Sequence, residues 1–393
     1  PQLHEIDKMK TLSLMLLLFG LVGMSACKRA SAPPAQTNSA SQPAELPQPT
    51  GGATTVAEVR YFRGSIGSTL GLQMKLNREG EKLSGDYYYQ KIGTKIELRG
   101  TVDKDSNLML EEFDSKGKQT GIFKGIWKDN EDGLISLAGN WSRPNSDKMV
   151  AFSLHQEPIH FTSAEITPKT VKETNKRLNY EINAQYPQVT GSTDRRFDKF
   201  NQEARNVVTR QVSMFRKEMA ERAKEEEEQG PSTEPETSGS DLSIGYTVNL
   251  ATDDLISVQF DIGDYYQGAA HPNSHSEVLN YDVKSEKALK LADLFKPGAK
   301  YLPAISSYSI QDLKKQSRAK GADSMLEDEW IGRGAGAEAS NYQSWTITRK
   351  GLGINFDSYQ VAPYAAGPQH VLIPYPVLKE LIKPEGVLAQ FVQ

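Results

Sequence analysis

A chain of 393 residues is too long for one ordinary hydrophobic core, so its length predicts two or three domains. The hydrophobic content of 37% is sufficient for packed domains, and the net charge of −4 arises from charges of both signs mixed along the chain. No basic face stands out, so nucleic acid is not an expected partner. The single cysteine, Cys27, excludes an internal disulfide, and packing alone must hold the domains together.

The N-terminal region has the features of a secretory signal. A lysine follows Met9, and an apolar run of roughly a dozen residues leads to two small residues, Ser25 and Ala26. The run is too short for a transmembrane helix, which needs about 20 apolar residues. We therefore predict a signal peptide over residues 1–26, in which residues 1–8 are an upstream extension.

The Met-Ser-Ala-Cys sequence ending at Cys27 resembles the bacterial lipobox, in which the cysteine becomes the acylated first residue of the mature protein. The sequence departs from that pattern at Met24, where leucine is usual. The resemblance implies a lipoprotein held on the membrane by palmitate-type chains on Cys27, because several acyl chains together give stable anchoring. Lys28, in place of aspartate, implies the outer membrane facing the periplasm if the cell is Gram-negative. The alternative is plain secretion with cleavage near Ala26.

The segment after the cysteine has hardly any apolar side chains. It consists mainly of Ala, Ser, Pro, Gln and Thr. Such a segment cannot bury enough surface to offset its chain entropy, so we predict that residues 27–55 form a lipidated, disordered tether. The tether would hold the first folded domain on the order of tens of ångströms from the bilayer.

Residues 56–156 contain short segments of alternating hydrophobicity, each bounded by a turn signal, with no helical stretch. The segments are 70–76, 85–89, 95–99, 108–112, 120–127, 134–141 and 149–154. This spacing predicts an antiparallel meander, an all-β N-terminal barrel or sandwich. Gly85, Gly100, Gly125 and Gly139 recur within or just before these segments, which is typical of strands that bend sharply.

From residue 166 onward, strands and helices mix without regular alternation, which predicts an α+β C-terminal module over residues 166–382. A strand over 182–186 is expected to end at Pro187, and the apolar residues that follow recur at helical spacing up to Met219. Residues 225–240 are acidic and rich in Pro, Ser and Thr, and we expect a mobile loop there. Further strands are expected at 242–250, 255–265, 278–283, 345–349, 353–356 and 370–373, and helices at 302–316 and 376–382.

The densest polar cluster covers residues 261–275. His271 and His275 are four residues apart and have carboxylates nearby, which suggests zinc. However, Pro272 prevents the helix that would place both imidazoles on one face, and only His370 offers another imidazole. A wide hairpin shaped by Gly, Pro and Asn explains the same residues, so we predict no metal and no cofactor.

A hydrolase would need an activated nucleophile. Ser274 lies beside His275, but no Gly-x-Ser-x-Gly turn accompanies it. The glycines after Arg333 lack the lysine of a phosphate-binding loop. No catalytic residue is therefore predicted. A cell-wall hydrolase that uses His271 or His275 with a nearby carboxylate stays an alternative.

Tyrosines are the main candidates for ligand binding. Three consecutive tyrosines, Tyr87 to Tyr89, must place rings on both faces of their strand. Exposed tyrosines suit the recognition of sugars or protein surfaces, although half-buried packing residues are the alternative. The ligand-binding candidates near the loop ends of the last module are Tyr265, Tyr266, His271, Asn273, His275, Tyr359 and Tyr364.

Two stretches resemble a tandem pair of domains in bacterial envelope proteins. Residues 180–191 (YEINAQYPQVTG), followed by FDKFN, resemble the accessory domain that precedes the catalytic domain of PdaC-type peptidoglycan deacetylases. Residues 263–273 (GDYYQGAAHPN), 279–283, 289–295, 346–356, 359–364 and 371–378 resemble the domain that follows it in RsiV-type anti-sigma factors, a domain of unknown function. Several pieces occur in the same order, over roughly residues 166–382.

The resemblance implies an α+β binding module without its own active site. In RsiV-type proteins these domains bind lysozyme, so the implied partner is a lysozyme-like protein or peptidoglycan. We therefore expect a non-enzymatic lipoprotein of the cell envelope. The alternatives are the cell-wall hydrolase above and a purely structural envelope protein.

Overall fold

The computed structural model describes residues 58–89, 94–130, 133–229 and 239–392. The predicted signal peptide, the lipid site at Cys27 and the tether lie outside these residues. Residues 55–393 form one compact unit. Within the described part of the chain, no helix combines the length and the apolar character needed to cross a membrane.

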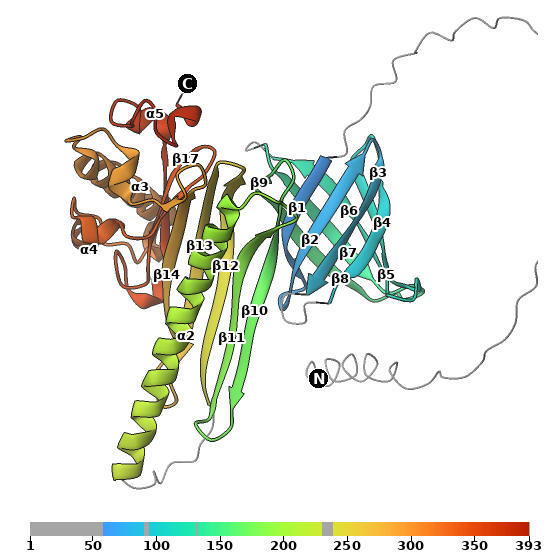
Figure 1. The fold of residues 1–393 in the computed structure, drawn as a ribbon, viewed down its shortest axis with the longest axis horizontal. Coiled ribbons are helices and arrows are strands. Elements are labelled where there is room, and N and C mark those ends of the chain that lie inside the picture. The colour runs from blue at the N-terminus through green and yellow to red at the C-terminus, as the bar shows by residue number, and fades with distance from the viewer. Residues whose placement is uncertain (1–57, 90–93, 131–132, 230–238, 393) are drawn as a thin grey trace, which may run out of the picture. The chain divides into compact units, whose positions relative to one another are not determined.

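The N-terminal part is a closed antiparallel barrel, so of the two predicted all-β forms the barrel is confirmed (Figure 1). Its strands are β1 (Glu58–Ile66), β2 (Leu70–Glu79), β3 (Lys82–Tyr89), β4 (Ile96–Val102), β5 (Asn107–Phe113), β6 (Gln119–Asp129), β7 (Ile135–Ser142) and β8 (Met149–Glu157). Pairing of β1 with β8 closes the barrel. The prediction missed β1, because Arg60 and Gly64 interrupt the apolar pattern on the face that Phe62 and Ile66 turn inward.

The strand alternation decides which barrel side chains are available for binding. Tyr87 is fully buried inside, and its hydroxyl lies 3.2 Å from the hydroxyl of Tyr89. Tyr88 points the other way, and its hydroxyl bonds to Gln73 on the outer surface. The three rings therefore occupy both faces of β3, as the sequence predicts.

The second part is a mixed sheet of seven strands with one long helix. The strands are β9 (Ile159–His160), β10 (Glu165–Asn175), β11 (Tyr180–Thr190), β12 (Ser240–Thr252), β13 (Leu255–Tyr265), β14 (Asn273–Asp282) and β15 (Lys287–Ala288), in the order β10-β11-β12-β13-β14-β15, with β9 beside β12. Helix α2 (Arg196–Gln229) packs across β11, β12 and β14 and extends beyond the sheet (Figure 1). Its buried residues are those at the predicted helical spacing, from Phe197 to Met219.

The predicted end of a strand at Pro187 is wrong. Strand β11 continues through Pro187 to Thr190, and Pro187 lies directly opposite Pro168 of β10. The parallel pairing of β11 with β12 covers only Tyr180 to Ala184. Beyond that pairing the missing N–H of proline costs no hydrogen bond to β12, so the strand tolerates it.

The predicted limits of the acidic loop at 225–240 are also wrong. Helix α2 continues to Gln229, because glutamate has a high helix propensity and the run of glutamates extends the helix. At the other end, Ser240 already belongs to β12. Residues 230–238 lie outside the described part of the chain.

The third part packs a small sheet and short helices against β12–β14. It contains α3 (Tyr301–Lys320), α4 (Asp328–Gly334), β16 (Trp345–Ile347), β17 (Gly351–Phe356), β18 (Gln369–Pro374) and α5 (Tyr375–Leu378), with 3-10 turns η1 (Leu291–Leu294), η2 (Gly321–Asp323), η3 (Ala339–Tyr342), η4 (Tyr364–Ala366) and η5 (Ala389–Phe391). The last helix is shorter than predicted, because the chain leaves it to form a bridge between Ile382 and Phe295.

A buried polar network holds the small sheet on the large one. The Ser257 hydroxyl donates to Oδ1 of Asn280 at 2.6 Å and accepts from the Ile347 N–H at 2.9 Å. The Asn280 amide donates to the Trp345 carbonyl at 2.8 Å. Both polar side chains are almost fully buried, and buried polar groups are costly unless paired, so this network sets the register between the sheets. It brings the loop after β17 to the β13–β14 hairpin.

Candidate functional site

Three aromatic side chains from distant parts of the chain meet at the end of the β13–β14 hairpin. His271, in the hairpin loop, stacks on Tyr364 with ring centroids 4.1 Å apart and 22° between the planes. The ring of Tyr359 lies 5.5 Å from that of Tyr364, between centroids. We call these three residues the ring cluster. Tyr359 is 52% exposed, so the cluster presents an aromatic surface to solvent.

Hydrogen bonds fix the orientation of the rings. The Tyr364 hydroxyl donates to the Pro272 carbonyl at 2.8 Å. Nδ1 of His271 lies 2.9 Å from the same carbonyl, which can only accept, so Nδ1 carries the proton. In neutral His271, Nε2 then accepts from the Tyr359 hydroxyl at 3.2 Å. Both imidazole nitrogens are therefore engaged within the cluster.

The backbone at Tyr359 adopts a conformation that is costly for a bulky residue. Its φ is +70°, in the left-handed region that favours glycine. The Trp330 indole N–H donates to the Tyr359 carbonyl at 3.0 Å and helps to hold this conformation. Strain of this kind persists only where surrounding contacts impose it, and it is frequent at binding sites. The conformation turns the ring of Tyr359 toward His271.

A polar hollow of about 480 Å³ lies beside the ring cluster along the same loop. Its lining includes His275, Ser276, Glu277, Ser344, Asp357 and Gln360. Oδ1 of Asp357 accepts from the Ser276 hydroxyl at 2.7 Å and from the Ser276 N–H at 3.1 Å. The hydroxyls of Ser276 and Ser344 are 2.7 Å apart. The polar hollow thus offers hydroxyl, amide and carboxylate groups within a few residues of the exposed rings.

Helix α2 holds one of the residues that line the polar hollow, Glu277 of β14. Arg210 and Gln211 both donate to the carboxylate of Glu277. This contact ties the β14 end of the hollow to the helix, so the hollow is supported from both the sheet and α2.

The structure places Tyr266 against helix α2 and not in the ring cluster. Tyr266 packs its ring on Phe215 of α2, with centroids 5.5 Å apart, and the Arg222 guanidinium lies 4.4 Å from its ring centre. Tyr265 pairs with Asp241 in the β12–β13 ladder. Tyr266 thus belongs to the packing of the helix on the sheet, and Tyr265 ends strand β13.

The two remaining candidates lie on β14. The Asn273 amide donates to Oδ1 of Asp264 at 3.5 Å, and His275 stands opposite Ile262. Burial raises the pKa of the Asp264 carboxyl above its ordinary value, while the nearby charge of His275 opposes the shift. Across the described residues, no three His, Cys, Asp or Glu side chains are grouped so that they could hold a metal ion.

Sequence reasoning missed Asp357, Gln360, Ser276 and Trp330. Gln360 lies between Tyr359 and Tyr364, so its position in the loop was a usable signal. Its amide donates to the carbonyls of Gly334 at 3.1 Å and Asn341 at 2.9 Å, which ties the loop to α4 and η3. The other three residues carry no local pattern and become neighbours only in the fold.

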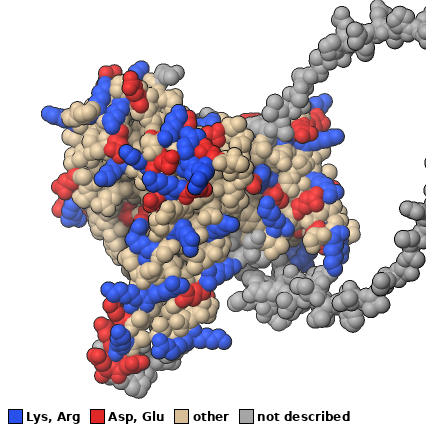
Figure 2. Space-filling model, viewed as in Figure 1, with Lys and Arg blue, Asp and Glu red and all other residues tan. Residues whose placement is uncertain are grey.

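Charges of both signs are interspersed over the face shown in Figure 2, and acidic side chains gather at the far end of α2. The face in view therefore presents no broad basic surface. This agrees with the mixed charge pattern along the sequence.

Comparison with known families identifies two segments. Residues 173–274 match the family described as deacetylase PdaC, and residues 292–376 match the family described as protein of unknown function DUF3298. The chain thus carries a PdaC-like segment followed by a DUF3298 segment, and the tandem resemblance inferred from the sequence is confirmed. The ring cluster draws His271 from the first segment and both tyrosines from the second.

Curated relatives match at low identity. The peptidoglycan-N-acetylmuramic acid deacetylase PdaC of Bacillus subtilis is 24% identical over 255 residues, which are 65% of this chain and 49% of that protein. The immunogenic proteins MPB64 of Mycobacterium bovis and MPT64 of Mycobacterium tuberculosis are each 24% identical over 115 residues, 29% of this chain and 47% of theirs. The chain therefore spans about half the length of the curated relatives it matches.

Two solved structures of the DUF3298 family also align. The protein from Bacteroides fragilis is 21% identical, covers 58% of this chain and 97% of its own, and has a TM-score of 0.44. The protein from Pseudomonas aeruginosa is 18% identical, covers 58% of this chain and 96% of its own, and has a TM-score of 0.40.

Proposed function

We propose that this chain is a non-enzymatic protein of the cell envelope whose C-terminal module binds peptidoglycan at the ring cluster. The observation that carries the proposal is the exposed stack of His271, Tyr359 and Tyr364 beside a hollow lined by hydroxyl, amide and carboxylate groups. The PdaC-like segment supports the cell wall as the place of action, since the relative from Bacillus subtilis is a peptidoglycan deacetylase.

The chemistry of a glycan suits this arrangement. A sugar ring has apolar C–H groups on its faces and hydroxyl groups at its rim. Flat aromatic rings cover the faces, and a few placed polar groups fix the orientation through hydrogen bonds. Ser276, Ser344 and Asp357 in the polar hollow can provide such bonds to the rim of a sugar whose face lies on the ring cluster.

The absence of catalysis in this proposal is supported by how the titratable groups are used. Both nitrogens of His271 are bonded within the cluster. A general base needs a free lone pair within hydrogen-bond reach of the proton it removes. The His271 imidazole is held as part of the aromatic surface, which suits recognition.

The proposed location rests on Cys27. A lipid on this cysteine, with residues 27–55 as a tether, would hold the folded unit at the membrane within reach of the wall. In a Gram-negative cell Lys28 directs the protein to the outer membrane, facing the periplasm. Lysozyme-like protein is the second candidate ligand, because the sequence pieces between residues 263 and 378 resemble the domain of RsiV-type proteins.

Replacing one ring of the cluster tests the proposal. The soluble unit, residues 55–393, is mixed with insoluble peptidoglycan, and the bound fraction is measured against ligand concentration. We expect Tyr359→Ala and Tyr364→Ala each to weaken binding about fivefold or more, because truncating a central aromatic anchor typically costs more than about 1 kcal/mol. Tyr265→Ala is the matched control, a tyrosine outside the cluster, and should bind like the wild type.

The alternatives give different results in the same experiment. If the unit bound a lysozyme-like protein and did not bind peptidoglycan, the ligand would be a protein and not a glycan. If the wild type released soluble fragments from peptidoglycan and the double variant His271→Ala and His275→Ala did not, the result would support the hydrolase. Binding of neither ligand would leave a structural role and refute the proposal.

A further inference from the structure

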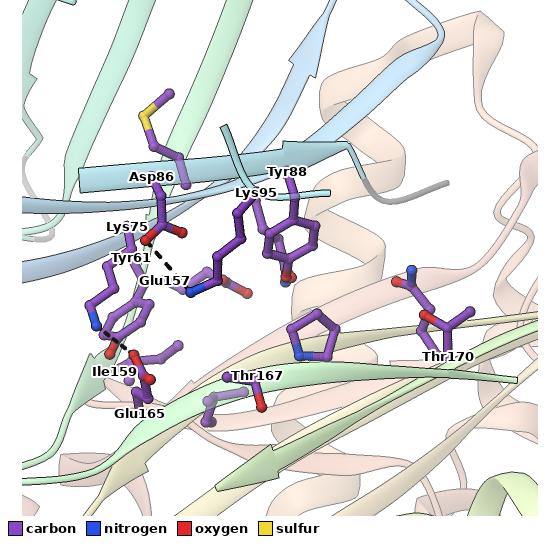
Figure 3. A pocket seen from close by; sticks show the side chains of 15 residues that line it. Tyr61, Lys75, Asp86, Tyr88, Lys95, Glu157, Ile159, Glu165, Thr167 and Thr170 are labelled. Carbon is purple, nitrogen blue, oxygen red and sulfur yellow. Dashed lines mark hydrogen bonds and ion pairs between the residues drawn. The ribbon is translucent and has the colours of Figure 1, made fainter. Parts of the chain in front are cut away.

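A second cleft lies far along the chain from the ring cluster, between the barrel and the β10–β11 ribbon (Figure 3). Its volume is about 230 Å³. One wall is the outer face of β1, β2 and β3, and the other is the face of β10 that carries Ile166, Pro168 and Thr170. We call it the junction cleft.

The junction cleft is open because the β10–β11 ribbon extends past the strand that pairs with it. The ribbon of β10 and β11 continues beyond Ala184, where the pairing of β11 with β12 ends. The barrel approaches the sheet there, and Arg63 of β1 lies over the ring of Tyr246 of β12, 4.7 Å from its centre. The ribbon and the barrel wall meet near Ile166 and are lined by polar side chains beyond it.

Two ion pairs border the junction cleft. Lys75 of the barrel bonds across the cleft to Oε2 of Glu165 at the start of β10. Lys95 lies 3.7 Å from Asp86, a loose pair in which Lys95 is 65% exposed. Figure 3 marks both pairs with dashed lines among the side chains that line the cleft. A loose, exposed pair such as Lys95 and Asp86 contributes little to stability, so its charges remain available to a ligand at small cost.

The remaining charge of the cleft is balanced. Glu157 also lines it, and this carboxylate bonds to Nε of Arg63 at 2.9 Å. With Arg63 included, the positive charges of the arginine and the two lysines equal in number the negative charges of the three carboxylates. A cleft whose positive and negative groups balance, and in which the pair of Lys95 and Asp86 is loose, favours a ligand that is itself a zwitterion over a simple anion or cation.

Two tyrosines add neutral hydrogen-bonding groups. Burial raises the pKa of both Tyr61 and Tyr88 above the ordinary value, so both hydroxyls keep their protons. Lys75 lies 6.0 Å from the ring centre of Tyr61, and Tyr88 bonds to Gln73 at the base of the cleft. The cleft therefore offers neutral hydrogen-bonding groups beside its charged side chains.

We propose that the junction cleft binds a short peptide end that carries both a free ammonium and a free carboxylate group. The carboxylate of the ligand would pair with Lys95, and its ammonium would pair with Asp86 or with the second oxygen of Glu165. The volume is below the roughly 300–1,000 Å³ of pockets for drug-sized ligands, so the cleft suits one or two residues. This site goes beyond the proposed function and does not depend on it.

Dipeptides with free and blocked ends test the proposal. Alanyl-alanine, N-acetyl-alanyl-alanine and alanyl-alanine amide are titrated against the unit of residues 55–393, and binding is followed by ligand-observed NMR. The free dipeptide should bind about tenfold more tightly than either blocked form, because each block removes one charged contact. Lys95→Met should weaken binding of the free dipeptide about tenfold. Lys95 is exposed, so this variant should fold normally.

Two controls separate the junction cleft from the ring cluster. Lys124→Met changes an exposed lysine of β6 outside the cleft and should leave dipeptide binding unchanged. Tyr364→Ala should also leave it unchanged. Equal binding of the free and blocked peptides, wild-type affinity in Lys95→Met, loss of binding in Tyr364→Ala, or no binding at all would each overturn the proposal. None of these results bears on peptidoglycan binding at the ring cluster.

Discussion

Gly64 shows how one residue permits the barrel to close. A Cβ at this position would lie 2.0 Å from the Ser153 carbonyl oxygen and 2.8 Å from Cα of Leu154, on the strand that closes the barrel. Gly85 has the same constraint, with 1.9 Å to the Lys75 carbonyl oxygen. The sequence predicts sharp bends at such glycines; the structure shows close contact between neighbouring strands.

We expect Gly64→Ala to lower the free energy of unfolding by about 1–3 kcal/mol, because a forced contact in a packed barrel costs that much. Urea unfolding of residues 55–393, followed by tryptophan fluorescence, measures the change. Gly245→Ala is the matched control, since a Cβ on this β12 glycine meets nothing within 4 Å. Equal stability of the two variants would contradict the role given to Gly64.

At the scale of elements, one carboxylate joins the long helix to the edge of the sheet. Glu173 of β10 accepts from the Tyr180 hydroxyl of β11 at 2.6 Å and from Nε of Arg216 of α2 at 3.1 Å. The hydrogen bond from Arg216, and after it that from Tyr180, lowers the pKa of Glu173 below its ordinary value of 4.5. The same three residues therefore link a strand, its neighbour and the helix that covers them.

This pKa shift predicts a dependence of stability on pH. A carboxylate whose pKa is lower in the folded state stabilises that state above its unfolded pKa, and the stabilisation is lost as pH falls through the folded value. We expect Glu173→Gln to be less stable than the wild type at pH 7, and the difference to narrow as pH falls below 4.5. Urea unfolding from pH 7 downward measures it.

Glu181→Gln serves as the control for this measurement, because Glu181 is an exposed carboxylate on the neighbouring strand β11. Its stability should follow that of the wild type at every pH. The free energies of unfolding of Glu173→Gln and the wild type could also differ by the same amount at every pH down to the acid range. That result would show that the Glu173 charge does not link α2 to β10.

At the scale of the whole molecule, the proposed lipid anchor on Cys27 would decide where the proposed binding surfaces operate. We expect Cys27→Ser to abolish incorporation of labelled palmitate and to move the protein from the membrane fraction to the soluble fraction, because the lipid is the proposed attachment. Lys28→Asp is the matched control: it should keep the label, and in a Gram-negative cell it should move the protein to the inner membrane. Label retained in Cys27→Ser would refute lipidation at this residue.

Local patterns predicted much of the fold because they depend on neighbours in the chain. Seven barrel strands and the apolar stripe of α2 follow from alternation and helical spacing. Strand β1 was missed because Arg60 and Gly64 disturb its alternation, and the end of β11 was misplaced because the cost of Pro187 depends on what lies beside the strand. Both strand errors arose because the pairing with a partner strand, and not the pattern within the segment, determines where these strands form and end.

The candidate site was predictable only in part. The sequence by itself determined the tandem of segments and the residue types that offer aromatic surface, including His271, Tyr359 and Tyr364. Only the tertiary structure decided that these three meet, that Tyr266 instead packs on α2, and that a second cleft opens beside the barrel. His271 and Tyr359 are 88 positions apart, and contacts at such separation leave no periodic trace in the chain.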